Sequence, residues 1–290
     1  LTRCFTLEYA ALFDVLVPAL AAWRLPVPLG GTTTHFRTAA LRALHGWDAW
    51  NVTEDADLGL RLARSGLRVT VFDSWTDEEA PVTVRGLLRQ RVRWKKGWMQ
   101  TLAVHLRDPA RLWRDLGPLK TASVLATFAS GVLGPLLWPA FTGVVVWLAW
   151  SGTLLQPEGF VAIARSTLVC LLVLCGALAM IGPLVLGALR QDLRRYLVLL
   201  PLLPLWQIAL CVASWTALVE LFADPYRWAK TDHGLAKRRG PMASAAPLCP
   251  EDQALRAIRP PSTGIATPVM KDAAGMHSDT VICATSSGVP

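Results

Sequence analysis

The sequence contains few charged residues for its length. Charged side chains make up 17% of the 290 residues, and 53% of the residues are hydrophobic. Soluble chains carry about 25% charged residues, and a chain this apolar is not intrinsically disordered. Acidic residues are the scarcer kind, with 21 against 29 basic residues, so the formal net charge is still +8. Such a composition is typical of a membrane protein that also has a polar, basic part.

Cysteine pairs and several ligand-binding motifs are absent. The six cysteines are scattered and form no CxxC pair, which excludes a disulfide-stapled miniprotein and argues against a zinc site. No P-loop, GxGxxG or GxSxG motif occurs, and the five histidines are dispersed. No nucleic-acid-binding motif accompanies the basic charge, so we expect no nucleic-acid partner.

Apolar residues are concentrated in the second half of the chain. A spanning helix needs about 20 apolar residues, and three runs are long enough: Thr121–Leu155, Val161–Leu189 and Tyr196–Phe222. The loop Ser151–Phe160 has no Lys or Arg and is expected outside, whereas Arg190–Arg195 is expected inside. The basic residues that follow the third run favour an inside C-terminus. Either that run re-enters, or the first run is more than one element.

A basic stretch precedes the first apolar run. Residues 83–120 contain ten Lys and Arg and two Asp, so this stretch alone has a net charge of +8, equal to that of the whole chain. Basic residues beside spans favour the cytoplasmic side and attract anionic lipid headgroups. We therefore expect an integral protein of the bacterial inner membrane with a cytoplasmic polar part and membrane lipids as partners.

Composition divides the chain into four parts. Residues 1–120 are mixed in character, residues 121–222 hold the apolar runs, and residues 223–239 form a short polar segment. Residues 240–290 are rich in Pro, Ser and Ala without periodicity. This last part predicts a disordered tail.

Two segments of the mixed part carry candidate binding chemistry. Gly30 and Gly31, followed by Thr32, suit a close approach of the backbone to a ligand, although a plain loop has the same composition. Thr53 suits a helix cap, and acids are favoured in the helical turn that follows it. Leu58 and Leu62, four residues apart, would form the buried stripe of this helix. On pattern alone this segment is an acidic helix start. The functional interpretation is that Asp55 is a general base that faces a pocket.

A helix is predicted over residues 85–106, after a strand over residues 67–72. Gln90, Arg93 and Trp94 are three and four residues apart and share one face of this helix. An Arg beside a Gln can hold a diphosphate, and an indole offers a stacking surface to a sugar ring. The alternative is a basic amphipathic helix on the membrane surface, and both interpretations can hold together.

The order of two short motifs carries a family resemblance. Thr53-Glu54-Asp55, followed by Gln90-Arg91-Val92-Arg93-Trp94, resembles the TED and QxxRW pair of family 2 glycosyltransferases. The spacing and the trailing apolar runs are similar to those of the processive branch, which includes cellulose, hyaluronan and chitin synthases. The resemblance covers about residues 1–234. It implies an α/β fold, the C-terminal part of a GT-A type nucleotide-sugar transferase domain, followed by an α-helical transmembrane region.

The resemblance also implies roles for individual residues. Asp55 is expected to be the catalytic base, with Thr53 and Glu54 as its motif neighbours. The residues expected to bind the donor diphosphate and the acceptor sugar are Gln90, Arg93, Trp94, Gly30, Gly31 and Thr32. The segment after the last apolar run resembles the FxVTxKG gating loop of cellulose synthases, with Trp for Phe, Lys for Val and His for Lys. Its candidate gating residues are Trp228, Lys230, Thr231 and His233.

The implied reaction is an inverting sugar transfer. The donor is a nucleoside-diphosphate sugar, expected to be a UDP-sugar, and the acceptor is a growing β-linked polysaccharide whose export would involve further subunits. The alternatives are a non-processive membrane glycosyltransferase with a lipid acceptor, and a non-catalytic membrane subunit that retains the motifs.

The family also needs a divalent metal, Mg²⁺ or Mn²⁺, bound by an earlier DxD-type motif. No such motif stands upstream of Thr53, and the only D-x-D is Asp55-Ala56-Asp57. The sequence begins at Leu1 without an initiator Met. We therefore expect a preceding half of the domain to hold the metal, no metal site within this chain, and no activity from the 290-residue chain alone.

Overall fold

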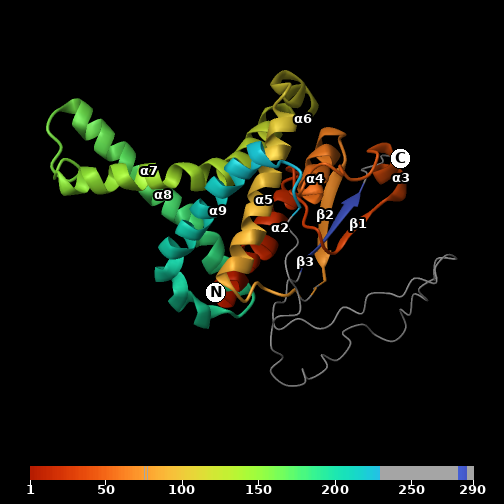
Figure 1. Cartoon of the computed structure of the whole chain (residues 1–290), viewed down its shortest axis with the longest axis horizontal. Helices are drawn as coiled ribbons and strands as arrows, with labels where there is room; N and C mark the ends of the chain where they lie inside the picture. The colour runs from red at the N-terminus through yellow and green to blue at the C-terminus, as the bar shows by residue number, and fades with distance from the viewer. Residues whose placement is uncertain (75, 77, 229–279, 286–290) are drawn as a thin grey trace.

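The computed structural model describes residues 1–74, 76, 78–228 and 280–285, and this part is mostly helical (Figure 1). The elements in chain order are α1 (Thr2–Ala10), the π-helix η1 (Ala11–Leu16), α2 (Val17–Ala22), β1 (Thr34–Phe36), α3 (Thr38–Ala43), α4 (Glu54–Arg64), β2 (Arg68–Asp73), α5 (Val84–His105), α6 (Pro109–Val124), the π-helix η2 (Leu125–Ala129), α7 (Ser130–Trp150), α8 (Phe160–Arg190), the 3₁₀-helix η3 (Arg194–Leu202), α9 (Leu203–Ala223) and β3 (Thr280–Thr285).

Four helical stretches are long and apolar enough to cross a membrane. They are Thr2–Ala22, Pro109–Trp150, Phe160–Arg190 and Arg194–Ala223. The last three overlap the three apolar runs expected from the sequence. Together these helices indicate an integral membrane protein.

The sequence does not predict the first of these stretches, because Glu8 and Asp14 interrupt its apolar run. In the structure both carboxylates have partners from distant helices. Arg91 donates hydrogen bonds of 2.9 and 2.6 Å to Glu8, and Gln191 donates one of 3.0 Å to Asp14. Pairing offsets part of the cost of placing a carboxylate in apolar surroundings. The mixed first part of the chain therefore includes a candidate span that was not among the three predicted runs.

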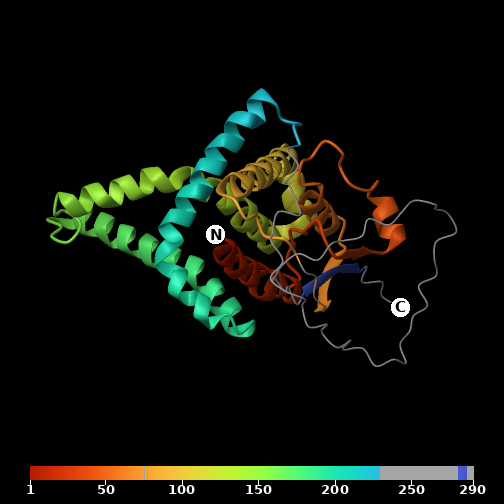
Figure 2. The same cartoon turned by 60° about the horizontal axis from the view of Figure 1, so that its bottom comes forward.

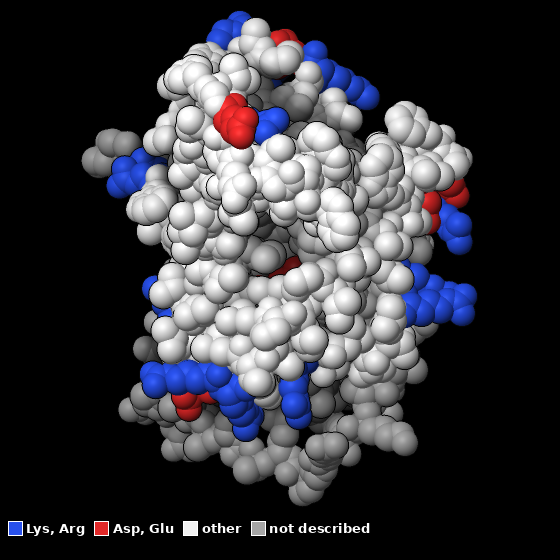
Figure 3. Space-filling view, turned by 90° about the vertical axis from the view of Figure 1, so that its left-hand side faces the viewer, with Lys and Arg blue, Asp and Glu red and all other residues white. Residues whose placement is uncertain are grey.

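Helices α7 and α8 form a hairpin that projects away from the rest of the molecule (Figures 1 and 2). Large apolar side chains cover its surface, and Trp150 and Leu178 are 91% and 64% exposed. Seen from the hairpin side, the surface is mostly uncharged, with Lys and Arg at its margins (Figure 3). An exposed apolar surface of this size is typical of a membrane contact.

One small sheet lies on the opposite side of the molecule, with the strand order β1-β3-β2 (Figure 1). Strand β3 is parallel to β1 and antiparallel to β2. The position of β2 confirms the strand predicted over residues 67–72. Strand β3 lies within residues 240–290, the part predicted to be a disordered tail. The rest of the predicted tail lies outside the described residues.

The predicted α/β character is only partly present. The described residues are mostly helical, and the sheet of a GT-A domain is not seen among them. The mixed part contributes only the three residues of β1 and the six of β2. Two strands this short cannot build a large sheet, because isolated pairs of strands are marginally stable.

Helix α4 follows the apolar spacing predicted for it. Leu58 and Leu62 are four residues apart and are fully buried in one cluster with Val27 and Leu29. This cluster holds α4 against the segment that leads to the glycine pair. The helix therefore packs through one apolar side, and the acidic residues of its first turn are not needed for this packing.

The predicted cap of α4 differs in one detail. Thr53 directly precedes the helix, but its side chain makes no capping hydrogen bond. Its hydroxyl instead donates a long hydrogen bond of 3.4 Å to Asn51. At the start of α5, by contrast, Thr83 accepts a bond of 3.0 Å from the backbone N–H of Gly86. Thr53 therefore serves the packing against α5 rather than the helix end.

Candidate active site

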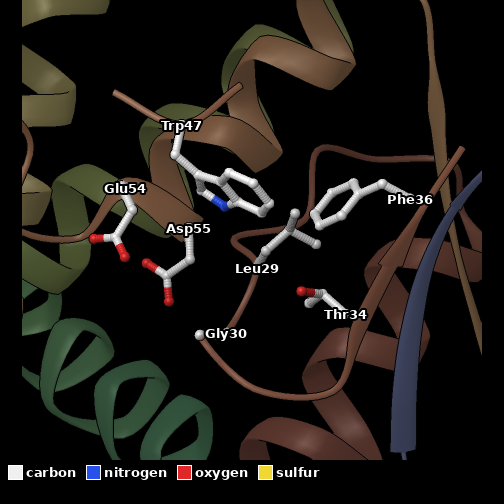
Figure 4. A pocket seen from close by; sticks show the side chains of 8 residues that line it. Leu29, Gly30, Thr34, Phe36, Trp47, Glu54 and Asp55 are labelled. Carbon is white, nitrogen blue, oxygen red and sulfur yellow. The ribbon is translucent and has the colours of Figure 1, made fainter. Parts of the chain in front are cut away.

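A pocket with a volume of about 380 Å³ opens beside the first turn of α4 (Figure 4). Its lining residues are Leu29, Gly30, Gly31, Thr34, Phe36, Trp47, Glu54 and Asp55. The carboxylates of Glu54 and Asp55 lie next to each other on one side of it, and Trp47 and Phe36 form its aromatic wall (Figure 4). The structure therefore brings the predicted TED acids and the predicted glycine pair to one cavity.

The carboxyl group of Asp55 has a perturbed acidity. Its pKa is raised from 3.8 to about 6, because burial and the neighbouring Glu54 both disfavour the charged carboxylate. The backbone N–H of Ala56, which donates a hydrogen bond of 2.7 Å to Asp55, and the cationic Arg93 both act to lower the pKa. Burial is the largest of these effects. A carboxylate whose pKa lies near neutral pH is suited to accept a proton from a substrate hydroxyl.

The glycine pair makes the close approach predicted for it, and the partner is Asp55. A Cβ atom on Gly31 would lie 3.2 Å from Oδ2 of Asp55. The backbone there is therefore in near contact with the reactive carboxylate. Thr32, which was predicted to act with the pair, does not line this pocket, and its hydroxyl donates to Glu78 instead. Thr34 supplies the hydroxyl on the pocket wall.

Two further glycines, which the sequence analysis did not single out, hold these segments together. A Cβ atom on Gly59 would lie 2.2 Å from the carbonyl oxygen of Val27, so α4 lies directly on the segment before Gly30. A Cβ atom on Gly97 would lie 2.1 Å from Oγ1 of Thr53, so α5 lies directly on the TED segment. Only glycine permits these backbone approaches. No local pattern marks either residue, because the contact partners are distant in the sequence.

Hydrogen bonds join the loop before α4 to α5. The side-chain amide of Asn51 donates a bond of 2.8 Å to Thr101, and the backbone N–H of Val52 donates one of 3.1 Å to Gln100. These bonds lie within two turns of the QxxRW residues on the same helix. The TED and QxxRW segments therefore belong to one rigid framework.

Arg93 is the QxxRW residue within electrostatic reach of the pocket acids. Burial lowers the pKa of Arg93, and Asp55 and Glu54 act in the opposite direction. Its guanidinium carbon also lies 5.6 Å from the ring centroid of Trp228, at the end of the described chain. An arginine remains cationic under such a shift. Arg93 therefore places a fixed positive charge near the carboxylates.

Gln90 and Trp94 are both enclosed by neighbouring side chains. Gln90 is 8% exposed, and within the described part of the chain its side-chain oxygen has no hydrogen-bond partner. Trp94 packs in a cluster with Phe5, and the guanidinium carbon of Arg91 lies over its ring at 4.6 Å from the centroid. Only the part of the indole left uncovered by Arg91 can meet a sugar.

Several cations of the basic stretch are used inside the protein. Arg91 is bonded to Glu8, and Lys95 donates a bond of 2.6 Å to the carbonyl oxygen of Gly131. Burial lowers the pKa of Lys95 to about 8. Lys96 is 0% exposed and lies 3.2 Å from Glu220 of α9. These cations therefore fix α5 to the apolar helices, in addition to any role toward a diphosphate or lipid headgroups.

The acids of the D-x-D sequence have different surroundings. Within the described ranges, no group of three or more His, Cys, Asp or Glu lies together. Of the D-x-D acids, only Asp55 lines the pocket. Asp57 is buried and bonded to Arg61 at 2.8 Å and to His105 at 2.9 Å.

Of the predicted gating residues, the structure describes Trp228, which lies against Arg93. Lys230, Thr231 and His233 lie outside the described residues.

Comparison with known proteins gives one match. Residues 1–231 match the family model described as glycosyl transferase family group 2. Neither the curated proteins nor the solved structures contain a significant match. The matched region covers most of the chain and includes the pocket, α5 and the four apolar helices. The chain therefore belongs to glycosyl transferase family group 2.

Proposed function

We propose that the pocket beside α4 is where a membrane-embedded, inverting glycosyltransferase activates its acceptor. The family implies a nucleotide-sugar donor and an acceptor. The observation that carries the proposal is the carboxyl group of Asp55, which lines a pocket, has a pKa of about 6 and lies near the cation of Arg93. A base and a fixed cation are the two groups that a one-step sugar transfer requires from the protein.

The reaction proceeds by direct displacement. Asp55 takes the proton from the acceptor hydroxyl while that oxygen attacks the anomeric carbon of the donor. The bond between this carbon and the diphosphate oxygen breaks, and the electron pair leaves with the nucleoside diphosphate. Because attack and departure occur on opposite faces, the configuration inverts. Arg93 balances the negative charge that develops on the leaving group.

The surrounding side chains suit a sugar. Trp47 lines the pocket and packs edge-on against Phe36, with 5.7 Å between ring centroids. An indole fixed in this way offers an apolar face to a pyranose ring.

We further propose that the acceptor is a growing β-linked polysaccharide and that the apolar helices pass it across the bacterial inner membrane. The support is the ion pair and hydrogen bonds of Lys95 and Lys96, which tie α5 to α7 and α9. Helix α5, which packs against the TED segment, is therefore joined to two of the candidate spans. The donor is expected to be a UDP-sugar, with Mg²⁺ or Mn²⁺ supplied outside the described residues.

Product length tests this function. The full-length protein in lipid nanodiscs is incubated with radiolabelled UDP-sugars, one at a time, and the products are separated by size at early times. We expect long polymers even at low enzyme concentration. A single added sugar that extracts into organic solvent would favour a lipid acceptor. A folded protein that transfers no sugar from any nucleotide donor would overturn the enzymatic proposal.

A further inference from the structure

A buried polar network lies on the side of α4 away from the pocket, and the transfer reaction does not use it. The side chains of Asp57 on α4 and His105 at the end of α5 are 3% and 4% exposed. One oxygen of Asp57 lies 2.9 Å from Nε2 of His105, and the other accepts a bond of 2.8 Å from Arg61. Nδ1 of His105 lies 2.9 Å from Arg64, which also bonds Asp115 of α6 at 2.6 Å.

The partners determine the protonation of this network. A guanidinium group can only donate, so Nδ1 of His105 must accept the bond from Arg64. The ring is then neutral, and its proton is on Nε2, which donates to Asp57. Burial acts to raise the pKa of Asp57, but the hydrogen bond from His105 and the charge and hydrogen bond of Arg61 lower it below the usual value. Asp57 is therefore a charged carboxylate whose two oxygens are both bonded.

The position of Asp57 on α4 gives the network a geometric consequence. Asp57 is two positions after Asp55, which places their side chains about 200° apart around a helix. Asp55 faces the pocket, whereas Asp57 faces α5. Arg61 also donates bonds of 2.8 Å to the carbonyl oxygens of Leu44 and Gly46, directly before Trp47 of the pocket wall. The network thus joins α4, α5 and the aromatic wall.

We propose that Asp57 and His105 are positioning residues that fix the rotation of α4 and so the aim of the Asp55 carboxylate. This inference rests on the proposed role of Asp55 as the base. A rotation of α4 by about 10° would move an atom at the helix surface by about 1 Å, given a helix radius of about 5–6 Å. A misplacement of about 1 Å can lower a rate about 100-fold.

The test compares two replacements of His105 in the full-length protein. The amide of His105→Gln supplies a donor and an acceptor that can replace the two ring nitrogens, whereas His105→Leu supplies neither. We expect kcat to fall about 10- to 100-fold in His105→Leu, with the KM for the nucleotide sugar within about twofold of the original. In His105→Gln, kcat should stay within about fivefold. Hydrogen exchange at the amides of α4 should accelerate only in His105→Leu.

A stability control separates positioning from general destabilisation. Leu184→Ala removes a buried side chain from a different cluster, which contains Leu7, Ala11 and Ala188. It should lower thermal stability about as much as His105→Leu and leave kcat nearly unchanged. If kcat in all three variants falls in proportion to stability, the positioning role is refuted.

A milder variant covers the case in which His105→Leu does not fold. Arg64 is partly exposed, so Arg64→Gln should fold, and we expect kcat to fall about threefold to tenfold because the tautomer of His105 is no longer fixed. Unchanged kcat in Arg64→Gln, with Asp55→Asn inactive, overturns the positioning role alone. An active Asp55→Asn instead overturns the role of Asp55 itself.

Discussion

The α4–α5 framework and the α7–α8 hairpin differ in how much of their helix surface is covered by the rest of the protein. In the framework, Gly59 and Gly97 bring backbones into contact, and buried Asp57 and His105 are bonded to each other. In the hairpin the protein covers little of the helix surface: within Phe160–Arg190, 11% of the most apolar window is buried in the molecule. The hairpin leaves its apolar surface for lipid to cover.

This difference separates the requirements of chemistry from those of membrane insertion. A general base must be held to within a fraction of an ångström, which requires specific bonds and close packing. A lipid-facing helix requires only apolar side chains over the thickness of the bilayer. Substitutions in the two regions should therefore differ in size and in kind.

The largest effect is expected at Asp55. Replacement by Asn removes the base while preserving size and one hydrogen-bond acceptor, so sugar transfer by the full-length protein should fall by at least about 10³-fold. Initial rates with a radiolabelled nucleotide sugar in nanodiscs measure this loss. Asp108→Asn, which alters an exposed helix cap on α6, is the matched control and should retain nearly full activity. Retained transfer in Asp55→Asn would refute the assignment of the base.

The next effect is expected at Gly97, where a Cβ atom would overlap Thr53. Gly97→Ala should push α5 away from the TED segment and lower kcat about 10- to 100-fold. Gly134→Ala on α7 is the matched control, because no atom lies within 4 Å of the added Cβ. It should leave kcat unchanged and stabilise α7 slightly, by about 0.5–1 kcal/mol. Equal rates for the two variants would show that the close contact is unimportant.

A smaller, graded effect is expected from pH. Because Asp55 acts when deprotonated and its pKa is about 6, kcat/KM should rise with pH and reach half its plateau near pH 6. Below that point it should fall about tenfold per pH unit. A profile of kcat/KM from pH 4.5 to 8.5, roughly the range over which such a base titrates, measures this. An unchanged rate down to about pH 5 would contradict the raised pKa.

The raised pKa of Asp55 also makes folding stability depend on pH. The folded-state pKa of Asp55 lies above its usual value of 3.8, so folding disfavours the charged form. The native protein should lose stability as the pH rises from about 4 to about 6, and Asp55→Asn should remove this loss. Thermal unfolding of both proteins at several pH values checks the direction.

The smallest effect is expected on the hairpin. Leu178 is 64% exposed, whereas Leu58 of α4 is 0% exposed. Leu58→Ala should lower the free energy of unfolding by about 2–5 kcal/mol, because it leaves a cavity. Leu178→Ala should lower it by less than about 1 kcal/mol, because lipid can fill the space. Chemical unfolding in detergent micelles measures both. Similar losses would indicate that another protein surface covers Leu178.

Local patterns in the sequence predicted several elements well. The spacing of Leu58 and Leu62 predicted α4, and the apolar runs predicted the last three candidate spans. The TED and QxxRW motifs predicted a glycosyltransferase, which the family match confirms. These signals are local, because they depend on residues that are neighbours in the chain.

Other features escaped prediction because they depend on distant partners. Arg91 and Gln191, which are remote in the sequence, pair the two acids within Thr2–Ala22. The small sheet includes β3, from a part that composition predicts to be without structure. Lys96 belongs to the basic stretch that was expected to attract lipid headgroups, yet it is buried against Glu220.

The sequence by itself determined that this is an apolar, basic membrane protein and which carboxylate is the best candidate for the base. Composition suffices for the first, and the second rests on the resemblance of the TED and QxxRW motifs to those of a known family, since both report on short segments of the chain. Tertiary structure alone decided that Gly31 lies beside Asp55 and that α5 contacts the TED segment at Gly97. It also decided that Asp57 is bonded to His105, on the side of α4 away from the pocket. The physical reason is that burial, acidity and backbone contact arise between segments that are remote in the chain.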